Sequence, residues 1–195
     1  MDRKKILLPV LLMCFATMAF AQQKDSVKVR LNHYSFSVGA GWTHFINNLE
    51  NGDQNLKNNF VGFTGKFFWE PEYLVSLGLE TGYFRLFNIS TEIKPDTTVE
   101  INRTVVPLLL LVRMRVVDNL HLTAGVGLAF ITNKSSGVGQ EIVTKTSSLA
   151  NFELAATYLY PLGKHWRVGG EAKIYRFGNL DDWMYSIQAV AAIRL

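Results

Sequence analysis

The chain has 195 residues, and its 20 Lys and Arg against 16 Asp and Glu give a formal net charge of +4. Loss of residues 1–21 would leave 17 basic and 15 acidic residues, and a charge of +2 does not predict a nucleic-acid partner. The only cysteine, Cys14, lies in that segment. The rest of the chain therefore has no thiol for a disulfide, a metal site or catalysis.

The N-terminus has the three parts of a secretory signal peptide. Basic residues 3–5 precede an apolar stretch over 6–20, and residues 19–21, Ala-Phe-Ala, form a small-x-small cleavage site. The apolar stretch is shorter than the roughly 20 residues of a spanning helix, so a membrane anchor is the less favoured alternative. We expect a signal peptide over residues 1–21, Sec export with cleavage after Ala21, and a charged periplasmic extension over residues 22–32.

An alternation of large apolar residues with small or polar ones begins at His33. Between His33 and Phe45, apolar side chains from Tyr34 to Trp42 share one parity, and Ser, Gly and Thr share the other. This two-residue period is that of a β-strand. At ~3.3 Å per residue and ~40° of tilt, Tyr34 and Trp42 lie about 20 Å apart across a membrane. That height is typical of the lipid-facing band of a β-barrel.

Seven further segments repeat the pattern, and we expect them to be strands: 60–69, 73–87, 103–116, 120–130, 149–160, 166–177 and 184–195. Short turns near residues 70–72, 117–119 and 161–165 alternate with connections at 47–59, 88–102, 132–148 and 178–182. Short turns at one end and long loops at the other are typical of bacterial outer-membrane barrels. The sequence predicts an all-β, eight-stranded antiparallel up-and-down transmembrane β-barrel over residues 33–195, with the short turns in the periplasm.

Aromatic residues near the predicted strand ends favour this barrel over the alternative, a soluble lipocalin-like barrel. Tyr and Trp concentrate where a membrane meets water. The expected lipid-interface aromatics are Tyr34, Trp42, Trp69, Tyr73, Tyr83, Tyr158, Tyr160, Trp166 and Tyr185. Pro107 cannot donate to a strand ladder, so we expect a bulge or a lapse in pairing there, at the outer rim.

Six charged residues have the inward parity and lie about four to eight residues from the short turns. They are Lys66, Glu80, Arg113, Glu153, Glu171 and Lys173. We expect these three acids and three bases to pair, because an unpaired buried charge costs several kcal/mol. The interior of an eight-stranded barrel is about filled by side chains. The prediction is a salt-bridge network that plugs the lumen, and a gated ion or proton path is the alternative.

Catalysis would need a nucleophile with a general base within hydrogen-bond reach. Thr43 and His44 form the one suggestive pair, and no acid is clearly placed to orient the histidine. Gly39-x-Gly41 and Gly125-x-Gly127 are inward strand glycines that relieve crowding, not a dinucleotide-binding loop. We expect no cofactor, no metal site and no enzymatic activity, with a lipid-modifying barrel enzyme as the less favoured alternative.

The segments that relate the chain to known proteins are 106–110 (VPLLL), 124–127 (AGVG), 152–160 and 169–172 (GGEA). With these segments the chain resembles small OmpA- and OmpX-like outer-membrane β-barrels, and more closely the PorT-like group. The resemblance implies a monomer in outer-membrane lipid, inserted by the barrel assembly machinery, with a structural or surface-interaction role through its long loops. The PorT-like part implies an alternative role in secretion or assembly of envelope proteins. The final Leu195 departs from the aromatic residue that the assembly machinery usually recognises.

Overall fold

The computed structural model describes residues 32–46, 55–71, 75–94, 97–137, 140–178 and 182–195. The chain divides into two units, Met1–Arg30 and Leu31–Leu195, and the description below concerns the second. The predicted signal peptide and residues 22–31 of the predicted extension lie outside the described residues. In the described ranges, no helix is long and apolar enough to cross a membrane.

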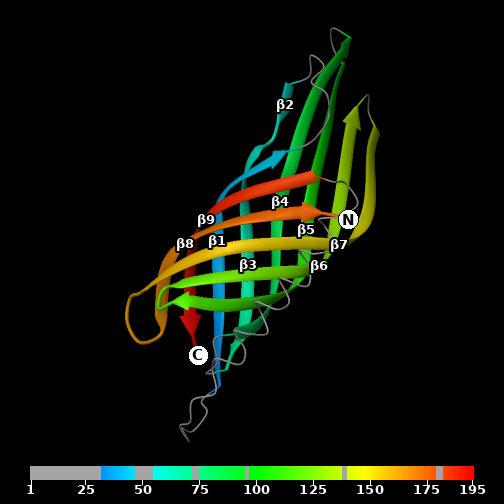
Figure 1. Cartoon of the computed structure of the whole chain (residues 1–195). Helices are drawn as coiled ribbons and strands as arrows, with labels where there is room; N and C mark the ends of the chain where they lie inside the picture. Colours follow the sequence, from blue (N-terminus) through cyan, green and yellow to red (C-terminus); the bar gives the residue numbers. More distant parts are fainter. Residues whose placement is uncertain (1–31, 47–54, 72–74, 95–96, 138–139, 179–181) are drawn as a thin grey trace, which may run out of the picture. The chain divides into compact units, whose positions relative to one another are not determined.

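Nine strands make up the described part of the chain, and eight of them close into an antiparallel barrel (Figure 1). The strands are β1 (His33–Ile46), β2 (Asn55–Lys57), β3 (Asn59–Glu70), β4 (Val75–Lys94), β5 (Thr97–Val117), β6 (Leu120–Gly137), β7 (Gln140–Pro161), β8 (Trp166–Phe177) and β9 (Asp182–Arg194). Pairing of β1 with β9 and of β4 with β5 closes the ring. Within the part of the chain that the structure describes, the short β2 pairs only with β4. The predicted eight-stranded antiparallel barrel is confirmed.

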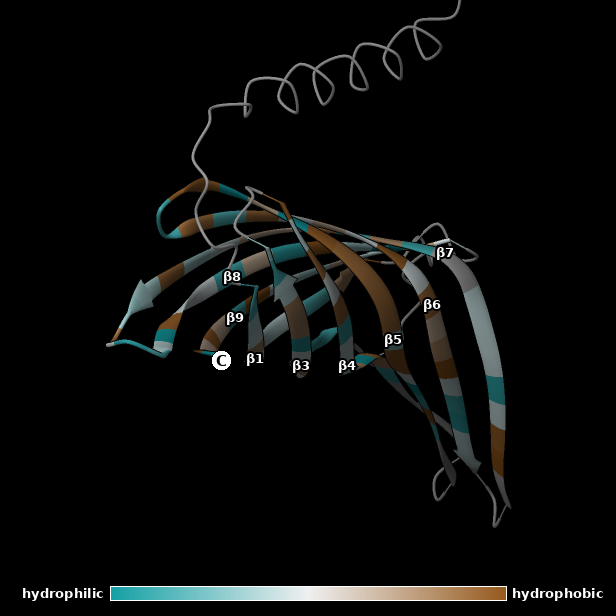
Figure 2. Ribbon diagram, turned by 90° about the horizontal axis from the view of Figure 1, so that it is seen from below, coloured by the Kyte–Doolittle hydropathy of each residue, from teal (hydrophilic) through white to brown (hydrophobic). Residues whose placement is uncertain are grey.

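The alternation along each strand separates an apolar outer wall from the lumen. In β1, Val38 and Trp42 are 49% and 47% exposed on the outside, whereas Ser37 and Thr43 are buried inside. Apolar and polar residues alternate in the same way along the ribbon in Figure 2. Large apolar side chains outside and polar ones inside are the reverse of a soluble sandwich, and they suit a barrel in lipid. The predicted facing is confirmed.

The predicted loops over 88–102 and 132–148 are wrong, because both segments are mostly strand. The β4–β5 ladder continues to Lys94 opposite Thr97, and the β6–β7 ladder continues to Gly137 opposite Gln140. Figure 1 shows both hairpins extending past the ends of β8 and β9. Residues 142–147 are exposed on both faces. Beyond the apolar band both faces meet water and the two-residue period is lost, yet Thr, Val and Ile still favour pairing.

The connections between the strands define the two ends of the barrel. We call the end with the connections after β3, β5 and β7 the short-turn end, and the opposite one the hairpin end. The predicted loop over 47–59 also contains a strand, Asn55–Lys57, and the first residue of another, β3. Its remaining residues are Asn58, which is not in a strand, and 47–54, which lie outside the described residues.

Pro107 lies inside β5, not at its end, because the strand continues for ten residues on the hairpin side. It is opposite Ala129 of β6, but on the β4 side the ladder passes from Thr81–Leu108 to Phe84–Val105. The ladder thus lapses beside Pro107 without a change of register, as predicted from the missing N–H donor. The change of register comes a few residues later, between Arg85 and Phe87.

Inward glycines leave room where the lumen is crowded. A Cβ atom at Gly39 would lie 2.6 Å from Gln188 Oε1 and 2.8 Å from Thr64 Oγ1. A Cβ atom at Gly41 would lie 2.0 Å from the carbonyl oxygen of Ile187. Carbon atoms do not approach at these distances without displacing backbone or side chains. These positions therefore need glycine for space, as the sequence predicted.

Candidate functional site

The candidate site is the barrel lumen, where four strands bring five charged side chains together. We call these residues the lumen charge cluster: Lys66 on β3, Glu80 on β4, Glu153 on β7, and Glu171 and Lys173 on β8. Each of the five is at most 5% exposed. A salt bridge this deeply buried needs close contacts and further hydrogen bonds to offset its desolvation.

Each ammonium group of the cluster contacts all three carboxyl groups. Lys66 Nζ lies 2.7 Å from Glu171, 3.0 Å from Glu80 and 3.5 Å from Glu153. Lys173 Nζ lies 2.7 Å from Glu171, 3.0 Å from Glu80 and 3.8 Å from Glu153. The cluster is thus one continuous network, and five of the six predicted lumen charges meet in it.

Neutral hydroxyl groups add hydrogen bonds to the network. Thr157 Oγ1 donates to Glu171 Oε2 at 2.6 Å, and the Tyr175 hydroxyl donates to Glu80 Oε1. Lys173 Nζ donates to the same Tyr175 oxygen at 3.3 Å. Tyr175 lies in the predicted strand over residues 166–177, but the predicted network of charged residues did not include it. Its position two residues after Lys173, on the same face of β8, is the signal that could have identified it.

Arg113 lies elsewhere, and its predicted place among the central charges is wrong. Its Nη2 is 2.5 Å from Glu70 Oε1, and its guanidinium carbon is 3.7 Å from the ring centre of Phe68. Ser35 and Arg194 also contact Glu70, at 2.5 Å and 3.7 Å. Glu70 had been assigned to a turn. Tilted strands are staggered, so an equal count of residues from the turns does not give an equal depth.

An apolar cluster fills the lumen between the charges and the hairpin end. Its fully buried members, each at most 1% exposed, include Phe45, Phe84, Leu86, Val105, Phe177 and Met184. Tyr175 joins it to the charge cluster, with its ring centre 5.3 Å from that of Phe84. Sequence reasoning missed this cluster. The inward-facing residues of β4 and β8 change from polar to apolar along each strand, and this change was the signal that could have identified the cluster.

β5 supplies much of the apolar inner wall. Leu109 and Leu111 face the lumen and are buried, while Leu108 and Leu110 are exposed on the outside. Figure 2 accordingly shows a long apolar stretch in β5. A strand that is apolar on both faces is expected where lipid lies on one side and a packed core on the other.

The suggestive pair, Thr43 and His44, is not assembled as a catalytic pair. Thr43 is 1% exposed and its hydroxyl donates to the carbonyl oxygen of Phe60 at 3.0 Å. His44 has the opposite parity, with Nδ1 2.8 Å from Asn59 Oδ1 and its ring stacked on Trp42. Consecutive strand residues point to opposite faces, which separates the two groups. Among the residues that the structure describes, no three His, Cys, Asp or Glu side chains group as metal ligands.

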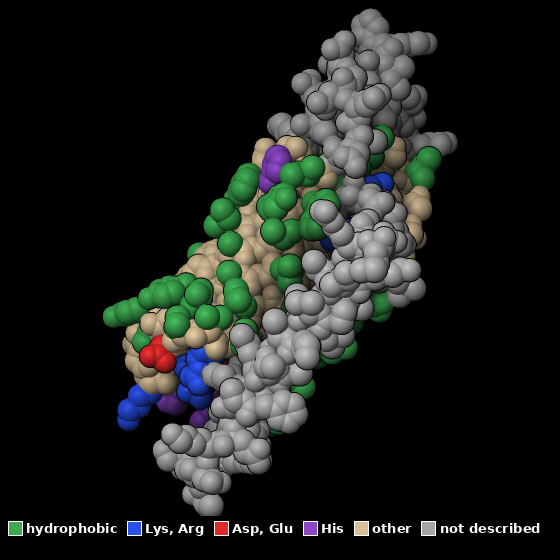
Figure 3. Space-filling view, viewed as in Figure 1, with side chains coloured by type: hydrophobic (Ala, Val, Ile, Leu, Met, Phe, Trp, Pro, Cys, Tyr) green, Lys and Arg blue, Asp and Glu red, His purple; other side chains and the backbone are tan. Residues whose placement is uncertain are grey.

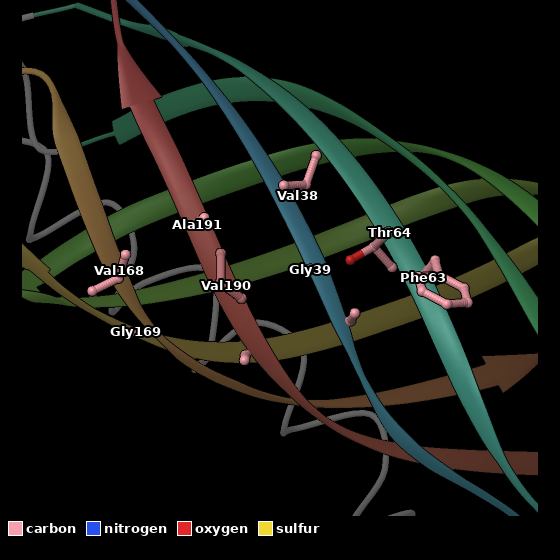
Figure 4. Close-up of a pocket in the computed structure, with 10 residues that line it drawn as sticks. Val38, Gly39, Phe63, Thr64, Val168, Gly169, Val190 and Ala191 are labelled. Carbon is pink, nitrogen blue, oxygen red and sulfur yellow. The ribbon is translucent and has the colours of Figure 1, made fainter.

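A shallow depression of about 740 Å³ lies along β1, β3, β8 and β9 (Figure 4). Most of the side chains that line it are aliphatic or aromatic, including the outward Val38, Phe63 and Val168. Thr64 is the polar side chain of the lining, and its hydroxyl already donates to Gln188 Oε1 at 2.7 Å. The depression offers apolar contact and no charged or nucleophilic group.

The outer wall carries the predicted aromatic residues. Eight of them are exposed on the outside: Tyr34, Trp42, Trp69, Tyr83, Tyr158, Tyr160, Trp166 and Tyr185. Tyr73 lies outside the described residues. Figure 3 shows apolar side chains spread over one face, with charged side chains at the short-turn end and a His side chain toward the opposite end. An apolar band bordered by such residues is the surface that a bilayer requires.

Comparison with known proteins agrees with this geometry. The comparison with curated proteins found no similar sequence. Among solved structures, the chain is similar to Ail, the attachment invasion locus protein of Yersinia pestis, in complex with the heparin analogue sucrose octasulfate. The identity is 14%, the TM-score is 0.56, and the match covers 84% of this chain and 99% of that one.

Two further structures show the same fold. A major outer membrane protein from Thermus thermophilus has 12% identity and a TM-score of 0.54, over 85% of this chain and 100% of that one. The outer membrane protein OprG from Pseudomonas aeruginosa has 12% identity and a TM-score of 0.50, over 83% and 95%. A family model, the outer membrane protein beta-barrel domain, matches residues 7–194. The chain therefore belongs to the outer membrane protein beta-barrel domain family and is an integral outer-membrane barrel.

Proposed function

We propose that this protein is a closed barrel that serves as a structural and surface-interacting component of the outer membrane, with its lumen plugged against diffusion. The filled lumen carries this proposal. The charge cluster is at most 5% exposed, and so are the buried aromatic and aliphatic side chains beside it. An eight-stranded barrel has little interior space beyond its own side chains.

The hairpin end supports an interaction with another protein. The β7–β8 ladder ends at Phe152 opposite Arg176, so the described residues 142–148 extend beyond β8. Ile142 and Val143 are 62% and 45% exposed, and they lie on opposite faces of the β6–β7 hairpin. A strand that extends past its neighbour also leaves backbone groups along its edge for a partner. We infer that the hairpins bind a protein outside the cell.

The proposal includes the orientation and processing of the chain. The short turns would face the periplasm, as in other barrels with one end of short turns. A signal peptide over residues 1–21 would be removed after Ala21, and the extension over residues 22–32 would be periplasmic. The barrel assembly machinery would insert the mature chain as a monomer. The cleavage can be checked by the intact mass of the purified protein, which should equal that of a chain beginning at Gln22.

Crosslinking in living cells tests which end of the barrel binds a partner. A photoreactive residue placed at Val143 or Lys145 on the hairpin is expected to capture a protein partner. The same residue at Leu162 or Lys164, exposed at the short-turn end, should capture none in the mature barrel. Leu110, which is 65% exposed in the apolar band, is the matched control for lipid-facing positions.

The opposite outcome has a definite meaning. Capture of a partner only from Leu162 or Lys164 would contradict the surface role and favour an accessory role in secretion or assembly, as the PorT-like resemblance suggested. We infer no catalytic role, since Thr43 and His44 point to opposite faces and the hydroxyl of Thr43 is already bonded. Loss of a lipid-modifying activity on replacement of His44 would overturn that inference.

A further inference from the structure

We propose that the lumen charge cluster binds one proton, shared between the carboxyl groups of Glu80 and Glu153, so that the cluster as a whole is neutral. The proposal rests on the filled lumen of the proposed function. It adds a bound proton to what would otherwise be a purely structural plug.

The first argument is the charge of the cluster. Two ammonium groups face three carboxyl groups, which would leave a surplus of one negative charge if all five were ionised. A surplus charge is strongly unfavourable where every member is at most 5% exposed. A carboxylic acid in such a place takes up a proton and becomes neutral.

Among the described residues, the ion pairs of the cluster involve no cation besides Lys66 and Lys173. On β7 and β8 the flanking groups are the hydroxyls of Thr157 and Tyr175. On β5 and β6 the nearest wall is Leu111 against Gly125, beside the Cβ of Glu153. Gln188 on β9 is neutral and accepts from Thr64 on β3. The surplus charge is therefore not balanced by direct contact.

Arg113 is the cation that could balance the cluster from a distance. It is close enough to Glu171 to act on it electrostatically. Its guanidinium group, however, is 2.5 Å from Glu70, an acid outside the cluster. Arg113 therefore pairs with a carboxylate that Arg194 also contacts, at 3.7 Å, and this described ion pair lies outside the cluster.

The second argument is that the two lysines lie at unequal distances from the three acids. Glu171 has both 2.7 Å contacts and a hydrogen bond from Thr157. Glu80 has two contacts of 3.0 Å and a hydrogen bond from Tyr175. Glu153 has only the two longest contacts, 3.5 Å and 3.8 Å. Glu153 is thus the least stabilised as a carboxylate and the best carrier of the proton.

The third argument is that each acid of the cluster has a buried oxygen atom without a hydrogen-bond partner. Within the described residues, Glu80 Oε2, Glu171 Oε1 and Glu153 Oε2 accept no well-angled hydrogen bond. Lys66 Nζ still lies 3.0 Å from the first and Lys173 Nζ 2.7 Å from the second, whereas the lysine contacts of Glu153 are through its other oxygen, Oε1. The carboxyl groups of Glu80 and Glu153 contact the same two ammonium groups, those of Lys66 and Lys173. Two carboxylates cannot share a hydrogen bond, but a carboxylic acid donates one to a carboxylate. One proton would satisfy both groups.

A bound proton makes the stability of the barrel depend on pH in a definite direction. Folding would take up a proton that the unfolded chain does not hold at neutral pH. This contribution to stability is fully present below the pKa of a carboxyl group in the unfolded chain, and it is lost as the pH rises through the point where the folded barrel releases the proton. Removing the surplus carboxyl group should remove this dependence.

Infrared spectroscopy of the folded protein in detergent micelles tests the proposal directly. The parent protein at neutral pH is expected to show the carbonyl band of a buried carboxylic acid, with a shift in heavy water. Glu153→Gln should lack this band. Glu171→Gln should lack it too, because two carboxylates then match two ammonium groups. Glu100→Gln, which changes an exposed acid on β5 outside the cluster, is the matched control and should keep the band.

Several outcomes would overturn the proposal. A parent protein without the band would show that the cluster carries its surplus charge or binds another cation. A band that persists in Glu153→Gln and Glu171→Gln would place the proton elsewhere. The thermal unfolding midpoint should fall with rising pH in the parent and not in Glu153→Gln, and equal slopes would also contradict the proposal. These readouts are separate from conductance, so a conducting parent would disprove the plug and leave the infrared result to decide on the proton.

Discussion

Replacing Lys66 with methionine is expected to destabilise the barrel by about 3–5 kcal/mol, the usual cost of breaking a buried ion pair by removing one partner. Lys66 contacts Glu171, Glu80 and Glu153 within 3.5 Å. The variant would leave three buried carboxyl groups around one ammonium group. The free energy of unfolding, measured by urea titration of the folded barrel in detergent with gel mobility as the readout, gives the loss.

Lys145→Met is the matched control for Lys66→Met. Lys145 lies on the exposed part of the β6–β7 hairpin, where both faces meet water. Loss of an exposed charge changes stability little, so this variant should match the parent. If Lys66→Met unfolded at the same urea concentration as the parent, the cluster would not contribute to stability and the plug would lose its physical basis.

Replacing Val38 with arginine is expected to cost roughly 2–4 kcal/mol of stability and to impair assembly, because Arg is disfavoured at the bilayer midplane. Val38 is 49% exposed on the outer wall, midway between Tyr34 and Trp42 on the same face of β1. The yield of folded protein in the outer-membrane fraction, read as the heat-modifiable band on a gel, measures the effect in cells. Unfolding in vesicles measures it in vitro.

Two controls on β1 distinguish the effect of the residue's depth in the membrane from the effect of the side of the strand on which it lies. Ile46→Arg keeps the parity of Val38 but moves the charge eight residues toward the hairpin end, where the cost falls to about 0–1 kcal/mol. Ser37→Asn changes a lumen-facing residue next to Val38, and we expect it to be tolerated. Assembly of Val38→Arg as efficient as that of the parent would mean that the assigned outer face is wrong.

The facing of the strands could be predicted because a two-residue period is a local property. Tyr34, Val38 and Trp42 fall on one side of β1 whatever the neighbouring strands do. The closure of the barrel followed from eight such segments with alternating connections. The depth of Arg113 could not be predicted in this way. Its distance from Lys66 depends on the stagger between β3 and β5, which is set by the whole ring and not by either segment.

Two other features could not be predicted from the alternation of apolar and polar residues, for a related reason. They are the length of the hairpins and the apolar part of the lumen. Residues 142–147 are paired in strands but face water on both sides, so they show neither alternation nor a turn signal. Phe84 and Phe177 have the inward parity, yet an apolar residue there fits both a lumen core and an irregular strand end. Only the meeting of β4 and β8 with Tyr175 between them shows that these rings form one core.

Conductance in planar lipid bilayers tests the closed lumen most directly. The purified mature barrel, reconstituted without other proteins, is expected to give no steady current, because the charge cluster and the apolar cluster occupy the path along its axis. Lys66→Met, if it assembles, is the variant most prone to leak. A large, steady open channel from the parent protein would contradict the plugged lumen.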